Sequence, residues 1–244
     1  MNQLHSQSAK AYLQKNREAI RYIVFVAVFS ALAYAVTFIF HIKVSFLTFD
    51  AKDAVITVAA FLLGPLGGTL ISLIVALIEM VSIGGTGFWG FLMDFVSTAS
   101  FAVTASVIYH YVRSARGALL SVGAASVASV SVMMLFNLFI TPIYMGVDRA
   151  TVVTMIPTLL LPFNVAKALL NTSITMLLYK PISLTLRRMQ LLPSLTSREA
   201  QKPQDSTSAS KMQFGFATLW IVLIALLAAA VSVFMFVKLH AKIG

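Results

Sequence analysis

The chain has 244 residues, of which 59% are hydrophobic and only 11% charged, and its mean hydropathy is +0.90. A typical soluble domain has about 25% charged residues, so this composition excludes a soluble globular enzyme, a disordered chain and a disulfide-rich secreted domain. It indicates a polytopic membrane protein. The net charge of +10 is typical of basic cytoplasmic loops in such proteins, so we expect no nucleic-acid partner. With no Cys and only four scattered His, we expect no metal site.

Long apolar runs divide the chain, and the first of them covers residues 21–40. This run follows a basic segment, but it is too long for the apolar core of a signal peptide, so we expect a retained first helix. A membrane-spanning helix needs about 20 mostly apolar residues. Further spans are predicted at residues 52–64, 66–83, 88–112, 118–143, 157–180 and 213–239.

The segments between the spans set the expected organisation. Gly64 and Pro65 predict a break after the short second span, because Gly and Pro terminate helices. We predict an all-α, polytopic membrane helix bundle, with a six-helix core and a seventh transmembrane helix at the C-terminus. Its expected divisions are a basic N-terminal tail (1–18), a six-helix substrate-binding domain (19–190), a polar linker (191–212) and an appended transmembrane helix (213–244).

The positions of the basic residues predict the orientation. With a cytoplasmic N-terminus, 12 of the 18 Lys and Arg residues fall on the cytoplasmic side, as the positive-inside rule favours. The last helix violates the rule mildly, because Lys238 and Lys242 then lie outside. We expect a multi-pass protein of the cell membrane.

Three ionisable residues fall within the predicted spans: Glu79, Asp94 and Lys167. Each costs about 2.5–3.5 kcal/mol at the bilayer centre, so such groups usually face a cavity or a partner. At about 1.5 Å per residue, their expected depths below the outer surface are roughly 6, 9 and 15 Å. The common level predicts one polar pocket open to the outside.

Further polar residues point to the chemistry of this pocket. Asn164, Lys167 and Asn171 share one helical stripe, and Asn137 lies near the outer end of the fifth span. Amide and ammonium groups suit a neutral heterocycle, since the amide both donates and accepts hydrogen bonds. Nearby aromatic rings are expected to cover the faces of a flat ligand: Phe46, Phe49, Trp89 and Phe163.

The same residues also fit purely structural roles, without a bound ligand. Glu79 and Lys167 fit an ion pair between two helices, and Asp94 fits a partner hydroxyl such as Ser97. Asn137 alone fits a hydrogen bond between helices. The first loop, residues 41–53, is interpreted either as a lid over the pocket or as an ordinary interfacial loop.

Helix one carries a second candidate surface. Ala27, Ala31 and Ala35 form a ladder of small residues that allows close approach of another helix, within the chain or from a partner. The sequence has no Walker motif and no repeated half. A transporter of this kind therefore needs an energising partner.

Taken together, these motifs resemble the substrate-binding S components of energy-coupling factor (ECF) vitamin transporters, most closely the riboflavin-specific ones. The similarity covers about residues 15–190. Besides the alanine ladder, it rests on residues 46–53 (FLTFDAKD), 64–68 (GPLGG), 79–87 (EMVSIGGTG), 137–144 (NLFITPIY) and 162–167 (PFNVAK). The N-terminal tail, the linker and the seventh helix depart from the six-helix pattern.

The resemblance implies high-affinity binding of riboflavin from outside, as a transported ligand and not a cofactor, by a subunit without catalytic activity. It implies a transmembrane coupling subunit and two ATPase subunits as partners in the bilayer, with the alanine ladder docking on the coupling subunit. The substrate-binding residues it implies are Thr48, Asp50, Glu79, Gly84, Asn137, Asn164 and Lys167.

Three other interpretations stay open from the sequence. The first is an S component for another vitamin or heterocycle, or for a close analogue such as flavin mononucleotide. The second is an intramembrane enzyme that uses Glu79 and Asp94 for acid–base chemistry. The third is a standalone channel or facilitator.

Overall fold

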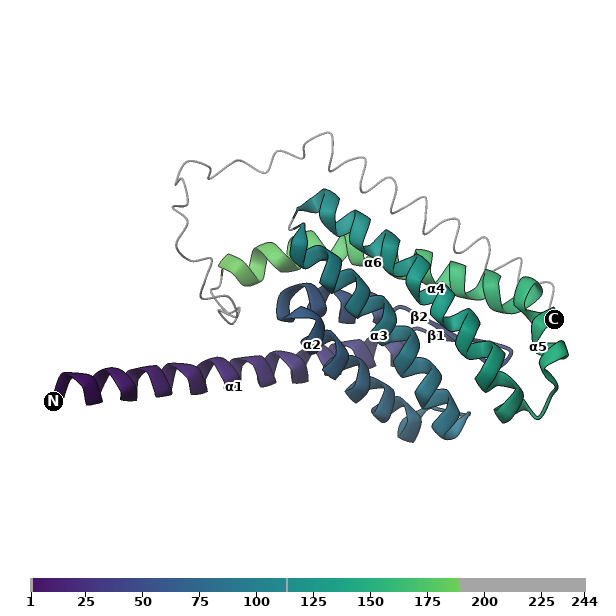
Figure 1. The fold of residues 1–244 in the computed structure, drawn as a ribbon, viewed down its shortest axis with the longest axis horizontal. Helices are drawn as coiled ribbons and strands as arrows, with labels where there is room; N and C mark the ends of the chain where they lie inside the picture. The colour runs from purple at the N-terminus through teal and green to yellow at the C-terminus, as the bar shows by residue number, and fades with distance from the viewer. Residues whose placement is uncertain (1, 113, 189–244) are drawn as a thin grey trace.

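The computed structural model describes residues 2–112 and 114–188. The predicted linker and seventh helix lie outside these residues. Figure 1 shows a helix bundle with one small hairpin. The elements in chain order are α1 (Asn2–Ile39), β1 (His41–Val44), β2 (Leu47–Asp50), α2 (Lys52–Ser82), α3 (Gly87–Tyr111), α4 (Ala115–Met145), α5 (Arg149–Met155), the π-helical segment η1 (Ile156–Leu160) and α6 (Leu161–Arg188).

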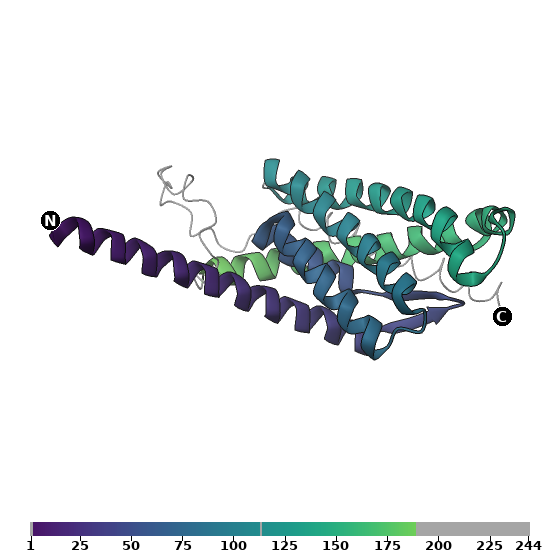
Figure 2. The same ribbon diagram turned by 60° about the horizontal axis from the view of Figure 1, so that its bottom comes forward.

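The bundle has the composition of a membrane protein. Five helical segments of the described chain are long and apolar enough to cross a bilayer: Leu13–Ile39, Lys52–Ser82, Gly87–Tyr111, Arg116–Met145 and Arg149–Tyr179. The N-terminal part of α1 extends past the other helices in both ribbon views (Figures 1 and 2). The mostly helical architecture confirms the predicted fold class.

Helix α2 is folded back on itself at Gly64. This residue has φ +83° and ψ 176°, a conformation that glycine adopts without steric cost, and Pro65 follows it. Lys52 and Glu79 would lie about 40 Å apart in a straight helix. Their side chains instead meet at 2.5 Å. The structure thus confirms the predicted break, and the two arms of α2 run antiparallel.

The core beside this bend depends on small residues. An added Cβ at Gly68 would lie 2.7 Å from the Cβ of Ala60 on the other arm. The buried face of α1, which includes Phe29 and Ala33, packs on Ala59 and other residues of α2. Close packing at the bend therefore brings the start and the end of α2 to the same level of the bundle.

The last described span begins earlier than its predicted start at residue 157. Helix α5 starts at Arg149 because the side chain of Asp148 caps it, accepting a hydrogen bond from the Thr151 N–H. The π-helical segment that follows contains Pro157, and the Leu161 N–H donates to Ile156 O five residues back. Because proline has no N–H to donate, the wider π turn joins α5 to α6 without ending the span.

The first loop forms a two-stranded antiparallel hairpin, in which His41 pairs with Asp50 and Val44 with Leu47. Its turn residue Ser45 has φ +57°. The hairpin lies at the end of the bundle opposite the N-terminus (Figure 2). Val44 and Phe49 pack in one cluster with residues of η1 and α6. The segment predicted as a loop is therefore an anchored element of the fold.

Candidate functional site

A cavity of about 330 Å³ lies at the hairpin end of the bundle. Such a volume is in the range of small-molecule pockets, about 300–1,000 Å³. Its walls come from the hairpin, the end of α2, the start of α3, the second half of α4 and the start of α6. All the residues predicted to bind substrate line it: Thr48, Asp50, Glu79, Gly84, Asn137, Asn164 and Lys167. Asp94, predicted at the same level, also lines it.

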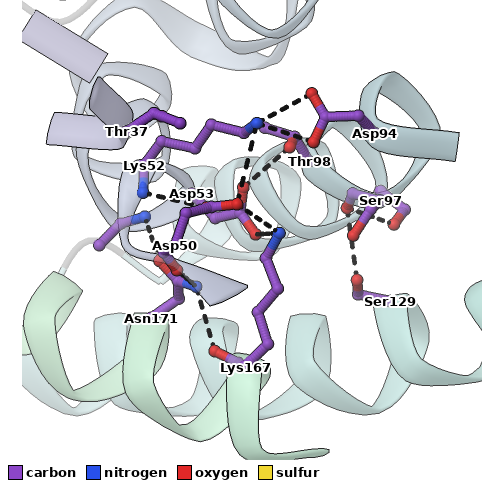
Figure 3. Close-up of polar contacts among 12 residues, drawn as sticks. Thr37, Asp50, Lys52, Asp53, Asp94, Ser97, Thr98, Ser129, Lys167 and Asn171 are labelled. Carbon is purple, nitrogen blue, oxygen red and sulfur yellow. Dashed lines mark hydrogen bonds and ion pairs between the residues drawn. The ribbon is translucent and has the colours of Figure 1, made fainter. Parts of the chain in front are cut away.

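Charged side chains form a polar group at the base of the cavity, and Lys52 pairs with the carboxylates on one side of it. Its side chain is 1% exposed, and its Nζ lies 2.5 Å from Glu79 Oε2 and 2.7 Å from Asp94 Oδ1. Figure 3 shows the extended Lys52 side chain reaching the Asp94 carboxylate. Asp50 Oδ2 lies 3.9 Å from the same ammonium. A single buried cation thus joins the hairpin, both arms of α2 and helix α3.

Lys167 pairs with the carboxylates on the other side of this polar group. Its Nζ donates to Asp50 Oδ2 at 3.0 Å and lies 3.8 Å from Asp53 Oδ2 (Figure 3). Thr98 Oγ1 donates to the other oxygen of Asp53 at 2.8 Å. The two lysines and four carboxylates form one connected group, which we call the floor network: Asp50, Lys52, Asp53, Glu79, Asp94 and Lys167.

Asp50 is the shared carboxylate of the floor network. Burial favours the neutral acid and by itself raises the pKa of Asp50. The ammonium groups of Lys167 and Lys52 favour the carboxylate, and they lower this pKa by more than burial raises it. The pKa of Asp50 therefore lies below its ordinary value. Asp50 remains ionised and ties the hairpin to α6.

The ion pairs differ from those expected. Within the described chain, the closest ammonium to Glu79 is that of Lys52, so the predicted pairing of Glu79 with Lys167 is wrong. Asp94 also pairs with Lys52 and not with the Ser97 hydroxyl. Lys52 was assigned to the first loop, residues 41–53, although only Asp53 separates it from the apolar run that follows. That position was the available signal for its burial.

The three asparagines have different roles. Asn171 is fully buried and does not line the cavity: its Oδ1 accepts from the Ala54 N–H at 2.9 Å, and its Nδ2 donates to Asp50 O at 3.2 Å. It caps α2 from α6, because the N-cap residue Ala51 has no side-chain acceptor. Asn137 and Asn164 do line the cavity. Asn164 Nδ2 donates to Leu160 O at the end of η1. Asn137 Nδ2 donates to Met133 O of its own helix α4, so Asn137 does not act as a bond between helices in the described chain.

The aromatic lining also differs in part from the prediction. Phe46 and Phe163 line the cavity as expected, together with Phe91 and Tyr144. Phe49 instead packs behind the wall, edge-on to Phe163 with ring centroids 5.9 Å apart, and Trp89 contacts Phe88. Phe46 meets Tyr144 in the same edge-on manner across the hairpin tip. These rings give the polar floor an apolar surround.

Gly84 shapes the rim of the cavity. Its N–H donates to Glu79 O at 2.7 Å and thereby ends α2. An added Cβ would lie 3.0 Å from that carbonyl oxygen and 3.1 Å from Met80 Cα, both backbone atoms. Glycine is needed here because the backbone approaches too closely for a side chain.

The alanine ladder lies on the open face of α1. Ala27, Ala31 and Ala35 are all exposed, whereas the opposite face packs on α2. Within the described residues, the ladder is therefore not used for packing inside the chain.

Comparison with known proteins identifies the family. Residues 21–179 match the family model described as "ECF transporter, substrate-specific component". The chain belongs to this family. It is 28% identical over 189 residues to "Riboflavin transporter RibU" of Staphylococcus aureus (strain TCH60), which covers 74% of this chain and 97% of that protein. It is also similar to the solved structure in "Structure and mechanism of the S component of a bacterial ECF transporter", with TM-score 0.61 and 25% identity over 70% of this chain and 99% of the other.

Membership settles the class of protein. This S component is a multi-pass membrane protein of a transport system and not an enzyme. The Glu79–Asp94 pair therefore has its place in the floor network of a transporter subunit and not in a catalytic centre.

Proposed function

We propose that this S component binds riboflavin and mediates its uptake across the cell membrane. The N-terminus is cytoplasmic in this proposal, so the cavity opens to the outside. The observation that carries it is the convergence of Glu79, Asn137, Asn164 and Lys167 on one cavity with an aromatic surround. The similarity to a riboflavin transporter supports the choice of ligand.

The lining suits the two halves of riboflavin. The isoalloxazine ring is flat, with carbonyl and nitrogen acceptors and one imide N–H donor, and the ribityl chain is a row of hydroxyls. Lys167 supplies donors, Glu79 supplies an acceptor, and the two amides supply both. Phe46, Phe91, Tyr144 and Phe163 cover ring faces. Thr48 and Asp50 belong to the hairpin, which closes the site, and Gly84 forms its rim.

The energy for uptake comes from partners in this proposal. The S component pairs with a transmembrane coupling subunit and two ATPase subunits, and it needs no cofactor of its own. The exposed ladder of Ala27, Ala31 and Ala35 is the docking face. Uptake into vesicles without ATPase partners would instead favour a standalone facilitator.

A ligand panel tests the proposal. The detergent-purified full chain is titrated with riboflavin, flavin mononucleotide, thiamine, biotin and folate, and intrinsic tryptophan fluorescence is followed. We expect strong quenching by riboflavin at the lowest concentration, and yellow protein when cells are grown with the vitamin. Tight binding of a different vitamin, with none of riboflavin, would assign the chain to another S component.

A further inference from the structure

Lys52 has an unusual place beside the proposed riboflavin site. It is 1% exposed and does not line the cavity, yet it pairs with three carboxylates that do: Glu79 and Asp94 at close range, and Asp50 at 3.9 Å. Burying a lysine is costly unless carboxylates surround it. The extended Lys52 side chain lies behind the cavity wall and fixes the position of the carboxylates that form this wall.

The two oxygens of Glu79 have different surroundings. Oε2 accepts the 2.5 Å hydrogen bond from Lys52. Oε1 is buried and has no hydrogen-bond partner within the described chain. An unpaired buried oxygen is unfavourable, and more so when it is charged. Glu79 lines the cavity, so a ligand donor that reaches Oε1 would remove this cost.

We propose that Lys52 is a positioning residue for the ligand: by holding Oε2 of Glu79, it presents Oε1 as an acceptor that selects a ligand N–H or O–H group. This inference rests on the proposed riboflavin function and adds the selecting atom to it. Lys52 acts through Glu79 and touches no ligand atom.

The contact also predicts what an isosteric amide does. In Glu79→Gln, the side-chain carbonyl faces the Lys52 ammonium, so the NH₂ group faces the cavity and replaces the acceptor by a donor. We expect riboflavin affinity to fall at least about tenfold, as for loss of a hydrogen bond to a charged group. Lys52→Met removes the positioning cation and lowers affinity by a similar factor.

A double-mutant cycle on the full chain tests this inference. Riboflavin affinity is measured for wild type, Lys52→Met, Glu79→Gln and the double variant. Both changes act on the same acceptor, Glu79 Oε1. We therefore expect the riboflavin affinity of the double variant to be no lower than that of the single variant with the lower affinity. Losses that multiply would show that Lys52 does not act through Glu79 and would overturn the inference. If Lys52→Met does not fold, Lys52→Gln, which replaces the ammonium by a neutral amide, goes through the same cycle under the same criterion.

Analogues of the ligand separate positioning from general destabilisation. N3-methylriboflavin lacks the imide N–H, and lumiflavin lacks the ribityl hydroxyls. We expect one of the two to bind wild type, Glu79→Gln and the Lys52 variant equally, because it lacks the donor that Glu79 selects. Equal losses for riboflavin and both analogues would overturn the inference.

A control variant and the wild-type titration complete the test. Thr98→Val removes a hydrogen bond to Asp53 in the same network, away from the cavity lining, and we expect unchanged affinity. A loss equal to that of Lys52→Met would show a nonspecific effect of the network and contradict the inference. Wild-type protein that does not bind riboflavin would instead overturn the proposed function, so the two failures are distinguishable.

Discussion

The floor network and the alanine ladder of α1 differ in charge, in burial and in whether they pack inside the chain. In the floor network, charges are buried or half-buried and each has a partner inside the chain. In the ladder, small apolar side chains are exposed and unused by the described fold. The contrast indicates that ligand binding and partner docking use separate residues. Substitutions in the two regions should therefore affect different steps of uptake.

The largest expected effect is at the ladder. Ala31→Leu should reduce vitamin uptake by cells to background, because a larger side chain prevents close approach of the partner helix. Riboflavin affinity of the purified variant should not change. Ala124→Leu is the matched control, since Ala124 is an exposed alanine on α4, and we expect normal uptake. Lost binding in Ala31→Leu would break the proposed separation.

The next effect is in the floor network. Lys167→Met should lower riboflavin affinity at least about tenfold, because a hydrogen bond to a charged group contributes about 1.5–3 kcal/mol. It also leaves Asp50 and Asp53 without their shared cation, so the thermal transition in detergent should fall. Lys15→Met, on the exposed part of α1, is the control for loss of one positive charge. Unchanged affinity in Lys167→Met would remove Lys167 from the site.

A smaller effect is expected behind the cavity. Asn171→Ala removes the cap of α2 and the bond to Asp50 O, and should destabilise the fold by about 1–3 kcal/mol. Riboflavin affinity should change less than in Lys167→Met, because Asn171 does not line the cavity. The thermal transition and the titration are compared on the same samples. A larger loss of affinity than in Lys167→Met would show that the cap itself shapes the site.

The smallest effect is expected away from both regions. The hydroxyls of Tyr109 and Tyr179 form a hydrogen bond beside Phe61, and none of the three lines the cavity. Tyr109→Phe should cost about 1 kcal/mol of stability and leave both affinity and uptake unchanged. A change in uptake would show that a third region takes part in transport.

Local sequence patterns predicted the parts of the molecule that depend on local chemistry. The break in α2 followed from Gly64 and Pro65. Of the predicted helical stripe, Asn164 and Lys167 line the cavity, whereas Asn171 lies behind it. The extension of the last described span to Arg149 was missed, although the Asp148 cap is a local signal.

Local sequence patterns did not predict which lysine pairs with which carboxylate in the floor network. Lys52 meets Glu79 across 27 residues and Asp94 across 42, and Lys167 meets Asp50 across 117. These pairings depend on the antiparallel arms of α2 and on the hairpin, which together set the level of each side chain. Hydropathy alone placed Lys52 at the boundary between the first loop and the second span, because it does not distinguish a lysine at a water surface from one paired in the interior.

A structure of the protein determined with riboflavin would test the central claim most directly. The account predicts the flavin in the cavity between the hairpin and α6, with a ligand donor on Glu79 Oε1 and Lys167 Nζ donating to a ligand acceptor. Lys52 should keep its contact with Glu79 Oε2. Riboflavin bound elsewhere on the chain, or in this cavity without contact to Glu79, Asn164 or Lys167, would contradict the account.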